Sequence, residues 1–416
     1  MRRQRQDAEK TEKTSVERTV REITENVRAR GDEAVFDYTE KFDGYRPPAL
    51  RVDPEVVTKA YSAVEPKTVE NLRFAAGRIR DFARRQRETL KELRYEISAG
   101  VTLGHKLIPI DSCGCYAPAG RYPLPSSALM SIIPAKVAGV GRIAAASPAS
   151  GGFNSIHPAV LVAMDIAGAD EIYCMGGAQA IAAFAYGTLS VPPVNLIAGP
   201  GNRYVTEAKR QLSGVVGVDM LAGPSEVVIL ADESADPVWI AADALSRCEH
   251  DPNSWAVLLL TSENLAQRVT EKIEAELKTL ETAELAGQTW ADNGRILVTE
   301  SLDEAIRLSD EIAPEHLQVM TENSPNVAAK LRNFGSLFLG YCAPVPFGDY
   351  ISGPNHILPT AGCARFSNGL NVHTFIKIST FQEITPEGGR FLSPRCAYLA
   401  GIEGLRGHQR SAELRG

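Results

Sequence analysis

The sequence has no long apolar run, no long basic block and no recognisable leader. No stretch of its 416 residues approaches about 18 uncharged apolar positions, so we expect no membrane span and no membrane partner. The formal net charge is −7, and without a basic block we expect no nucleic-acid partner. The opening residues, MRRQRQDAEKTEKTS, lack the apolar core of a signal peptide, so we expect a protein that is not secreted.

Cysteine is scarce and unevenly spaced. The chain has seven cysteines, an odd number scattered over its length, which does not indicate a disulfide framework. Cys113 and Cys115 form a CxC pair, but no second pair accompanies them, so they are a poor zinc signal. We therefore expect reduced thiols and a cytoplasmic location.

The composition is that of a soluble globular protein, with 44% hydrophobic and 23% charged residues. From residue 128 onward, short apolar runs alternate with helical segments, a pattern typical of parallel strands with crossover helices. We expect two α/β units, preceded by amphipathic helices and followed by a loop-rich tail from about residue 345. The expected strands are 142–146, 171–174, 195–198, 227–231, 255–261, 294–299, 316–320 and 335–340. The expected helices there are 157–167, 178–186, 203–212, 236–250, 263–280 and 301–311.

Two glycine-rich segments join a strand to a helix. In IAGPGNRYVTEAKRQL (197–212) an apolar strand runs through GPGN into a helix, and GGAQ (176–179) has the same context. Glycines let a backbone approach a ligand, and a helix N-terminus favours a phosphate. The spacing is not GxGxxG, so a tight strand-to-helix turn explains the segments equally well.

Glu315 and His316 stand next to each other in IAPEHLQV (312–319). Neighbouring side chains do not share a face of a regular element, so both can serve one site only at the end of an element. In such a place the histidine is a candidate general base and the carboxylate a candidate activator of water. The alternative is a surface glutamate beside a capping histidine.

Three further polar clusters hold candidate metal ligands. They are ALSRCEHDPNS (244–254), GDYISGPNHILPT (348–360) and IEGLRGHQRS (402–411). His250, Asp349 and His408 are residue types that bind zinc. They come from distant parts of the chain, so their spacing does not show that they meet, and a turn-forming aspartate or a solvated terminal turn explains each cluster alone.

An ordered set of motifs resembles the histidinol dehydrogenase family. The motifs are GGAQAIAAFAYGT (176–188), GPGNRYVTEAKRQL (199–212), DMLAGPSEVVILAD (219–232), APEHL (313–317) and GDYISGPNHILPT (348–360), and the resemblance runs from about residue 15 to 412. It implies an α/β fold of two incomplete Rossmann-like domains with extended terminal pieces, forming a homodimer with shared active sites. It also implies the NAD-dependent oxidation of L-histidinol, through an aldehyde, to L-histidine, with zinc bound.

The resemblance implies the following parts and roles. The parts are an N-terminal helical segment (1–44), a discontinuous Rossmann-like domain (45–115 plus 226–365), an NAD-binding domain (116–225) and a dimer-intertwining tail (366–416). The catalytic residues are His316, as base for the hydroxyl proton, and Glu315, as activator of water. The NAD contacts are Tyr116, Gln179 and Asn202. The zinc ligands are His250, Asp349 and His408. The substrate contacts are Ser225, Arg247, His250, Asp349, His356, Glu403, His408 and Arg121.

Two positions depart from the family pattern. Arg247 stands where the family has a glutamine that serves as the fourth zinc ligand, and arginine cannot ligate because it has only donors and stays charged. We expect the three other ligands to hold zinc with Arg247 turned away; in the alternative, zinc is weak or absent and the guanidinium supplies the positive charge.

The second departure is in CYAPAGRYPLPSSALM (115–130), where Ala119 replaces a glycine and Arg121 follows Gly120. This loop, together with FIKISTFQEIT (375–385) and GHQRS (407–411), resembles the sulfopropanediol dehydrogenases, which oxidise an anionic hydroxymethyl substrate. An arginine in the loop suits a sulfonate or carboxylate, although a solvated loop arginine is an equal alternative. A non-catalytic homologue is a third hypothesis, which the intact Glu315 and His316 disfavour.

Overall fold

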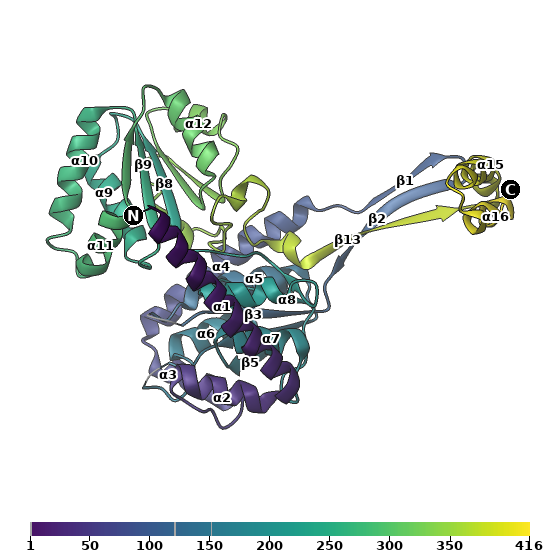
Figure 1. The fold of residues 1–416 in the computed structure, drawn as a ribbon, viewed down its shortest axis with the longest axis horizontal. Coiled ribbons are helices and arrows are strands. Elements are labelled where there is room, and N and C mark those ends of the chain that lie inside the picture. Colours follow the sequence, from purple (N-terminus) through teal and green to yellow (C-terminus); the bar gives the residue numbers. More distant parts are fainter. Residues whose placement is uncertain (1, 120–121, 151) are drawn as a thin grey trace.

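The chain forms two α/β lobes and a projecting arm (Figure 1). The computed structural model describes residues 2–119, 122–150 and 152–416, and of residues 2–13 the backbone alone. The first lobe comprises residues 14–89 and 112–218, the second lobe residues 226–350, and the arm residues 93–109 and 376–416. No helix in the described part of the chain is long and apolar enough to cross a membrane.

Both lobes are built on parallel sheets with the same strand order. In the described residues, the first sheet has five strands in the order β5-β4-β3-β6-β7, and the second has five in the order β10-β9-β8-β11-β12. Counted within each lobe, both orders are 3-2-1-4-5, which is the Rossmann order without a sixth strand. The first sheet consists of β3 (Ser112–Tyr116), β4 (Arg142–Ser147), β5 (Glu171–Cys174), β6 (Leu196–Ala198) and β7 (Gly217–Val218). The second consists of β8 (Glu226–Ala231), β9 (Trp255–Leu260), β10 (Arg295–Val298), β11 (His316–Met320) and β12 (Ser336–Leu339).

Helices cover both faces of each sheet, which is why the central strands are buried along their whole length. Strand β8, with the sequence EVVILA, is buried at all six positions, β11 at all five, and β4 at five of six. The crossover and connecting helices are α5 (Pro125–Ala138), α6 (Pro158–Ala167), α7 (Gly177–Tyr186), α8 (Arg203–Leu212), α9 (Pro237–Cys248), α10 (Glu263–Glu276), α11 (Ala283–Asn293), α12 (Leu302–Ile312), α13 (Ser324–Ala328) and α14 (Val345–Tyr350).

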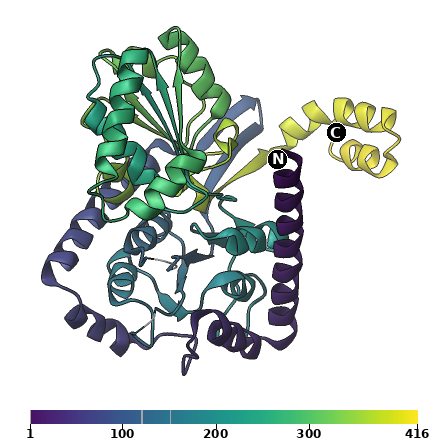
Figure 2. The same ribbon diagram turned by 60° about the vertical axis from the view of Figure 1, so that its left-hand side comes forward.

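The N-terminal helices complete the first lobe. Helix α1 (Arg2–Arg30) runs along that lobe in Figures 1 and 2 and buries Val20, Ile23 and Val27 in the same apolar cluster as α7 and α8. Helix α2 (Asp32–Asp43) joins the same cluster. On the other face, α3 (Pro54–Ala63) and α4 (Pro66–Thr89) pack with α5 and α6.

The arm is an antiparallel sheet with a helical pair at its tip. Strands β1 (Leu93–Ser98), β2 (Val101–Pro109) and β13 (Ile376–Ile384) form the sheet, and β13 pairs with β2 without interruption from Ile376 against Pro109 to Ile384 against Val101. Helices α15 (Pro386–Ile402) and α16 (Arg406–Glu413) follow. They lie at the end of the arm, away from both lobes, in Figures 1 and 2.

The structure confirms the predicted α/β class, and all eight expected strands and six expected helices occur within a few residues of their expected bounds. The boundaries of the domains in the structure differ from the expected ones. Residues 45–115 were grouped with the second lobe, but β3 is the central strand of the first sheet, and α3 and α4 pack on first-lobe helices. The arm sheet, strands β3 and β7, and helices α5, α11, α13 and α14 are not among the expected elements.

Candidate active site

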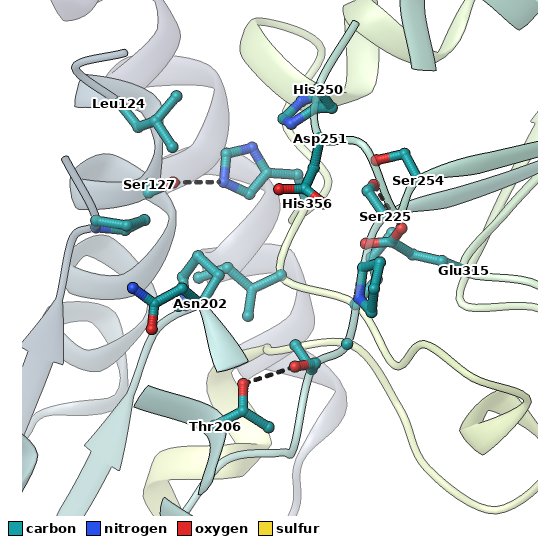
Figure 3. Close-up of a pocket in the computed structure, with 18 of the residues that line it drawn as sticks. Leu124, Ser127, Asn202, Thr206, Ser225, His250, Asp251, Ser254, Glu315 and His356 are labelled. Atoms are coloured by element: carbon teal, nitrogen blue, oxygen red, sulfur yellow. Dashed lines mark hydrogen bonds between the residues drawn. The ribbon is translucent and has the colours of Figure 1, made fainter. Parts of the chain in front are cut away.

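A large cavity lies between the two lobes. Its volume is about 1010 Å³, and both lobes contribute to its lining. Figure 3 shows Ser127 and Asn202 on one side, Ser225 and Glu315 on the other, and His356 between them. A cavity of this size is at the upper end of the range of small-molecule sites, which suits a substrate and a cofactor together.

The two sheets present opposite ends to this cavity. Pro118 follows β3 and Asn202 follows β6, so the first sheet contributes residues beyond its carboxyl ends. Ser225 precedes β8 and His316 is the first residue of β11, so the second sheet contributes its amino ends. Only the first lobe therefore follows the usual rule that open α/β sheets bind ligands at their carboxyl ends.

Glu315 and His316 do sit at the end of an element, the condition under which both can serve one site. The Glu315 carboxylate accepts hydrogen bonds from the Ser225 hydroxyl (2.7 Å) and the Glu226 backbone N–H (2.8 Å). The imidazole of His316 has Nδ1 3.1 Å from the Glu226 carbonyl oxygen and 3.2 Å from a Glu315 oxygen, and Nε2 3.3 Å from Asp349 Oδ1. Both ring nitrogens thus face acceptors.

These contacts determine the charge of the pair. Burial alone would favour a neutral ring, but the Glu315 carboxylate and then the bond to Asp349 outweigh it and raise the pKa of His316 to about 9. Burial opposes ionisation of Glu315 too, yet His316 and Arg247 lower the pKa of that carboxyl. The resting site therefore holds an imidazolium between two carboxylates, and the ring must lose its Nε2 proton before it can accept one.

Arg247 lies at the centre of the same network. It comes from the last turn of α9, and only 4% of its side chain is exposed. Its Nη1 donates to the Ser225 hydroxyl (2.7 Å) and its Nη2 to Asp349 Oδ2 (3.0 Å). The expectation that Arg247 turns away from the site is therefore wrong: an ion pair with Asp349 draws the guanidinium in, and Arg247 and His316 hold the pKa of Asp349 well below its usual range.

Two further histidines, His250 and His356, line the cavity between the lobes. His250 lines the cavity three residues after Arg247, and burial together with that cation lowers the pKa of its ring. His356 has Nε2 3.2 Å from the Ser127 hydroxyl and Nδ1 2.8 Å from the Asp349 carbonyl oxygen. It thus connects α5 of the first lobe to α14 of the second, and Figure 3 shows its bond to Ser127.

Comparison with known proteins decides the family. The sequence profile described as histidinol dehydrogenase matches residues 5–416. Histidinol dehydrogenases of Rhizobium meliloti and Methanococcus maripaludis are each 45% identical to the chain, covering 96% and 98% of it and 92% and 95% of the relatives. The crystal structure of histidinol dehydrogenase from Elizabethkingia anophelis superposes with a TM-score of 0.91 at 36% identity, covering 96% of this chain and 91% of that one. The chain belongs to the histidinol dehydrogenase family.

The metal that this family implies does not fit the residues of this chain as they are arranged. Among the described residues, no group of three or more histidine, cysteine, aspartate or glutamate side chains is placed to hold a metal ion. One oxygen of Asp349 is taken by Arg247 and the other faces His316. A metal at Asp349 would have to displace a buried guanidinium, and breaking a buried ion pair costs roughly 3–5 kcal/mol.

The end of the cavity near α8 is suited to NAD. The GPGN segment turns tightly from β6 to α8, where a Cβ on Gly199 would overlap the Tyr116 carbonyl oxygen and one on Gly201 the Val205 side chain. The glycines are thus explained by the turn. The turn nevertheless places the N-terminus of a ten-residue helix, with its cap Asn202, at the cavity, where it favours a phosphate group.

The two other expected NAD contacts are not among the residues that line the cavity. The Tyr116 hydroxyl accepts a hydrogen bond from the Gly177 N–H at the start of α7 (3.1 Å). Gln179 is fully buried, and neither polar atom of its side chain has a partner within the described part of the chain. Both residues lie in the first lobe, at the carboxyl side of its sheet, and their contact with NAD stays a prediction.

Two expected substrate contacts, Glu403 and His408, are not among the residues that line the cavity of this chain. Glu403 and His408 are exposed on the arm, whose tip lies away from both lobes (Figure 1). Arg121 lies outside the described residues. The ligand set His250, Asp349 and His408 is therefore not brought together within one chain.

Sequence reasoning missed two polar residues of the site. The carboxylate of Glu226 accepts hydrogen bonds from the backbone N–H groups of Glu315 and Ala361, both at 3.1 Å, and so positions the catalytic pair. Glu226 is a charged residue directly before the apolar run VVILA, and this contrast in the sequence could have indicated a role in the site. Ser127, the partner of His356, lies in an otherwise apolar helix and had no such signal.

We expect Glu226→Gln to change how stability depends on pH. Burial, and then the nearby Glu315 carboxylate, raise the pKa of Glu226 to about 7, above the roughly 4.3 of an unfolded glutamate. Between these values the folded chain binds more protons than the unfolded one, so the free energy of unfolding falls as the pH rises. Glutamine does not titrate, so urea unfolding should show the variant gaining up to about 4 kcal/mol over wild type as the pH rises from about 4 to about 8.

Glu281→Gln, at an exposed position of the same lobe, is the matched control and should follow the wild-type curve. A Glu226→Gln curve that runs parallel to wild type over the whole pH range would contradict the assignment.

Proposed function

We propose that the chain is an NAD-dependent dehydrogenase that oxidises L-histidinol, by way of an aldehyde, to L-histidine, a reaction of amino-acid biosynthesis. The observation that carries the proposal is the placement of Glu315 and His316 together in the cavity between the lobes. The named relatives at 43–45% identity are histidinol dehydrogenases, which favours histidinol over the anionic hydroxymethyl substrate. A binding module without activity would not need this pair.

The chain's own residues divide the chemistry in two. In the alcohol step, His316 first releases its Nε2 proton to the buffer, and the neutral ring then accepts the hydroxyl proton at Nε2. In the aldehyde step, the ionised Glu315 accepts a proton from the attacking water, and the Ser225 hydroxyl and the Glu226 N–H keep that carboxylate in place. Bound NAD would supply the hydride acceptor for both oxidations. Asn202 and the N-terminus of α8 would bind it, and Tyr116 and Gln179 would be its further contacts in the first lobe.

The proposal includes a homodimer with shared active sites. The tip of the arm exposes a group of large apolar side chains to solvent: Phe391, Tyr398, Leu399, Ile402, Leu405 and Leu414. Exposed apolar patches of this kind mark protein interfaces. A second copy that covers the tip would bury them and bring Glu403 and His408 to its own cavity. Free thiols at all seven cysteines, every one of them in the described residues, suit a cytoplasmic enzyme.

The reaction is tested by counting NADH formed from limiting L-histidinol in alkaline buffer. We expect two NADH per histidinol from wild type and at least about 100-fold slower turnover from His316→Ala, because the base is lost. NAD binding, followed by fluorescence quenching, and the melting temperature serve as controls and should survive in the variant. Fast turnover by the variant would exclude His316 as the base, and no NADH from a folded wild-type protein would refute the substrate.

Glu315→Gln separates the two half-reactions. A glutamine oxygen can still accept the bonds from Ser225 and Glu226, but it cannot take a proton from water. With histidinal as substrate we expect oxidation to slow by about 10²-fold or more, whereas the alcohol step, followed in single turnover, should slow far less. Equal slowing of both halves would contradict the division of roles.

The dimer is tested with the double variant Leu399→Glu/Ile402→Glu. Charges on these exposed residues of α15 would be buried in the interface, so sedimentation should show monomers and histidinol oxidation should be lost. Leu189→Glu changes an equally apolar, 96% exposed residue of the first lobe and should leave the dimer intact. A dimeric, active double variant would rule out the tip as the interface.

A further inference from the structure

The buried position of Arg247 is the feature that the family resemblance does not account for. Its guanidinium is almost fully enclosed, donates from Nη1 to the Ser225 hydroxyl at 2.7 Å and from Nη2 to Asp349 at 3.0 Å, and lines the cavity. Its Nε is buried too and has no hydrogen-bond partner in the part of the chain that the structure describes. A cation with an unused donor is thus built into the wall of the site.

This cation contacts one candidate metal ligand of the cavity and lies close in sequence to another. Asp349 and His250 are the two candidate ligands in the cavity; Arg247 binds one directly and precedes the other by three residues on the same helix end. The guanidinium has donors only, so it cannot join a ligand set, and it stays charged at any working pH. A divalent ion bound to Asp349 and His250 would lie beside the permanent positive charge of Arg247. It would also remove the carboxylate of Asp349 as the partner of that guanidinium.

We propose that the guanidinium of Arg247 takes the place of the metal ion, so that this enzyme binds and oxidises its substrate without a divalent metal. The reaction itself rests on the function proposed above, whereas the exclusion of the metal does not. Arg247 holds Asp349 and, through Ser225, the Glu315 carboxylate, which are the groups that need a nearby cation. Toward the substrate it can only donate, so the atom that faces it carries a lone pair, such as a hydroxyl oxygen or an unprotonated nitrogen.

The first test uses the wild-type chain as purified, in its native oligomeric state. After dialysis against EDTA and then metal-free buffer, we expect less than about a tenth of a zinc ion per chain by mass spectrometry. Histidinol oxidation should change by less than about twofold on EDTA treatment or on addition of zinc chloride. Zinc chloride should not raise the melting temperature, because a ligand that binds the folded state would raise it.

Variants at the same position test the cause. Arg247→Gln removes the charge and adds an oxygen that can ligate, so it should acquire about one zinc ion per chain and melt higher with zinc. Arg247→Leu removes the charge without adding a ligand and should bind zinc less tightly than Arg247→Gln. The double variant Arg247→Gln/His250→Ala should lose the acquired zinc, which separates binding in the cavity from binding to exposed cysteines.

Two results would overturn the proposal: about one zinc ion per wild-type chain that survives dialysis, or activity that EDTA abolishes and zinc restores. If a substitution prevents folding, the wild-type zinc content and melting temperature still decide. A wild-type protein that stays free of zinc but oxidises no histidinol in any buffer would refute the proposed function and support the exclusion of the metal.

Discussion

The site depends on one constraint: four charged side chains share a largely buried network and must neutralise one another. Arg247 and His316 are positive, Glu315 and Asp349 are negative, and each has a partner of opposite sign within 3.3 Å. An unpaired charge in such surroundings costs several kcal/mol, so no member can be lost without a change in another. Charge balance therefore holds the catalytic pair in place before any substrate arrives.

The fold meets this constraint because the carboxyl ends of one incomplete Rossmann-like sheet face the amino ends of the other across the cavity. The first lobe turns the carboxyl ends of its strands and the N-terminus of α8 toward the cavity, an arrangement that attracts phosphate. The second lobe turns the amino ends of β8 and β11 toward it, where backbone N–H groups hold Glu226 and Glu315. The cofactor end is thus built from helix and loop backbone, and the reactive end from charged side chains. Neither lobe makes a site alone.

Most strands and crossover helices of the two lobes were predictable because their apolar residues recur with regular periods. Helix α5 was not, because PSSALMSIIPAKVA is apolar on all sides and contains Pro134, so no amphipathic period marks it. The arm was missed because β1 and β13 are mostly exposed, and β13 joins the β1–β2 hairpin only by pairing across more than 260 residues. The adjacency of Glu315 and His316 was visible in the sequence, but the meeting of Arg247 with Asp349 depends on tertiary packing, and there the sequence-based expectation for the arginine was wrong.

Arg247 shows why the roles of a family's residues must be transferred to a sequence one residue at a time. The carboxylates of Glu315 and Asp349 require positive charge nearby, and in this site the Arg247 guanidinium occupies the Asp349 oxygen that a metal ion would need. A metal ion is exchangeable and accepts lone pairs from several ligands; a guanidinium is covalently fixed and only donates. On our proposal, Arg247 at the end of α9 therefore changes how the site binds its substrate and leaves the roles of Glu315 and His316 in place.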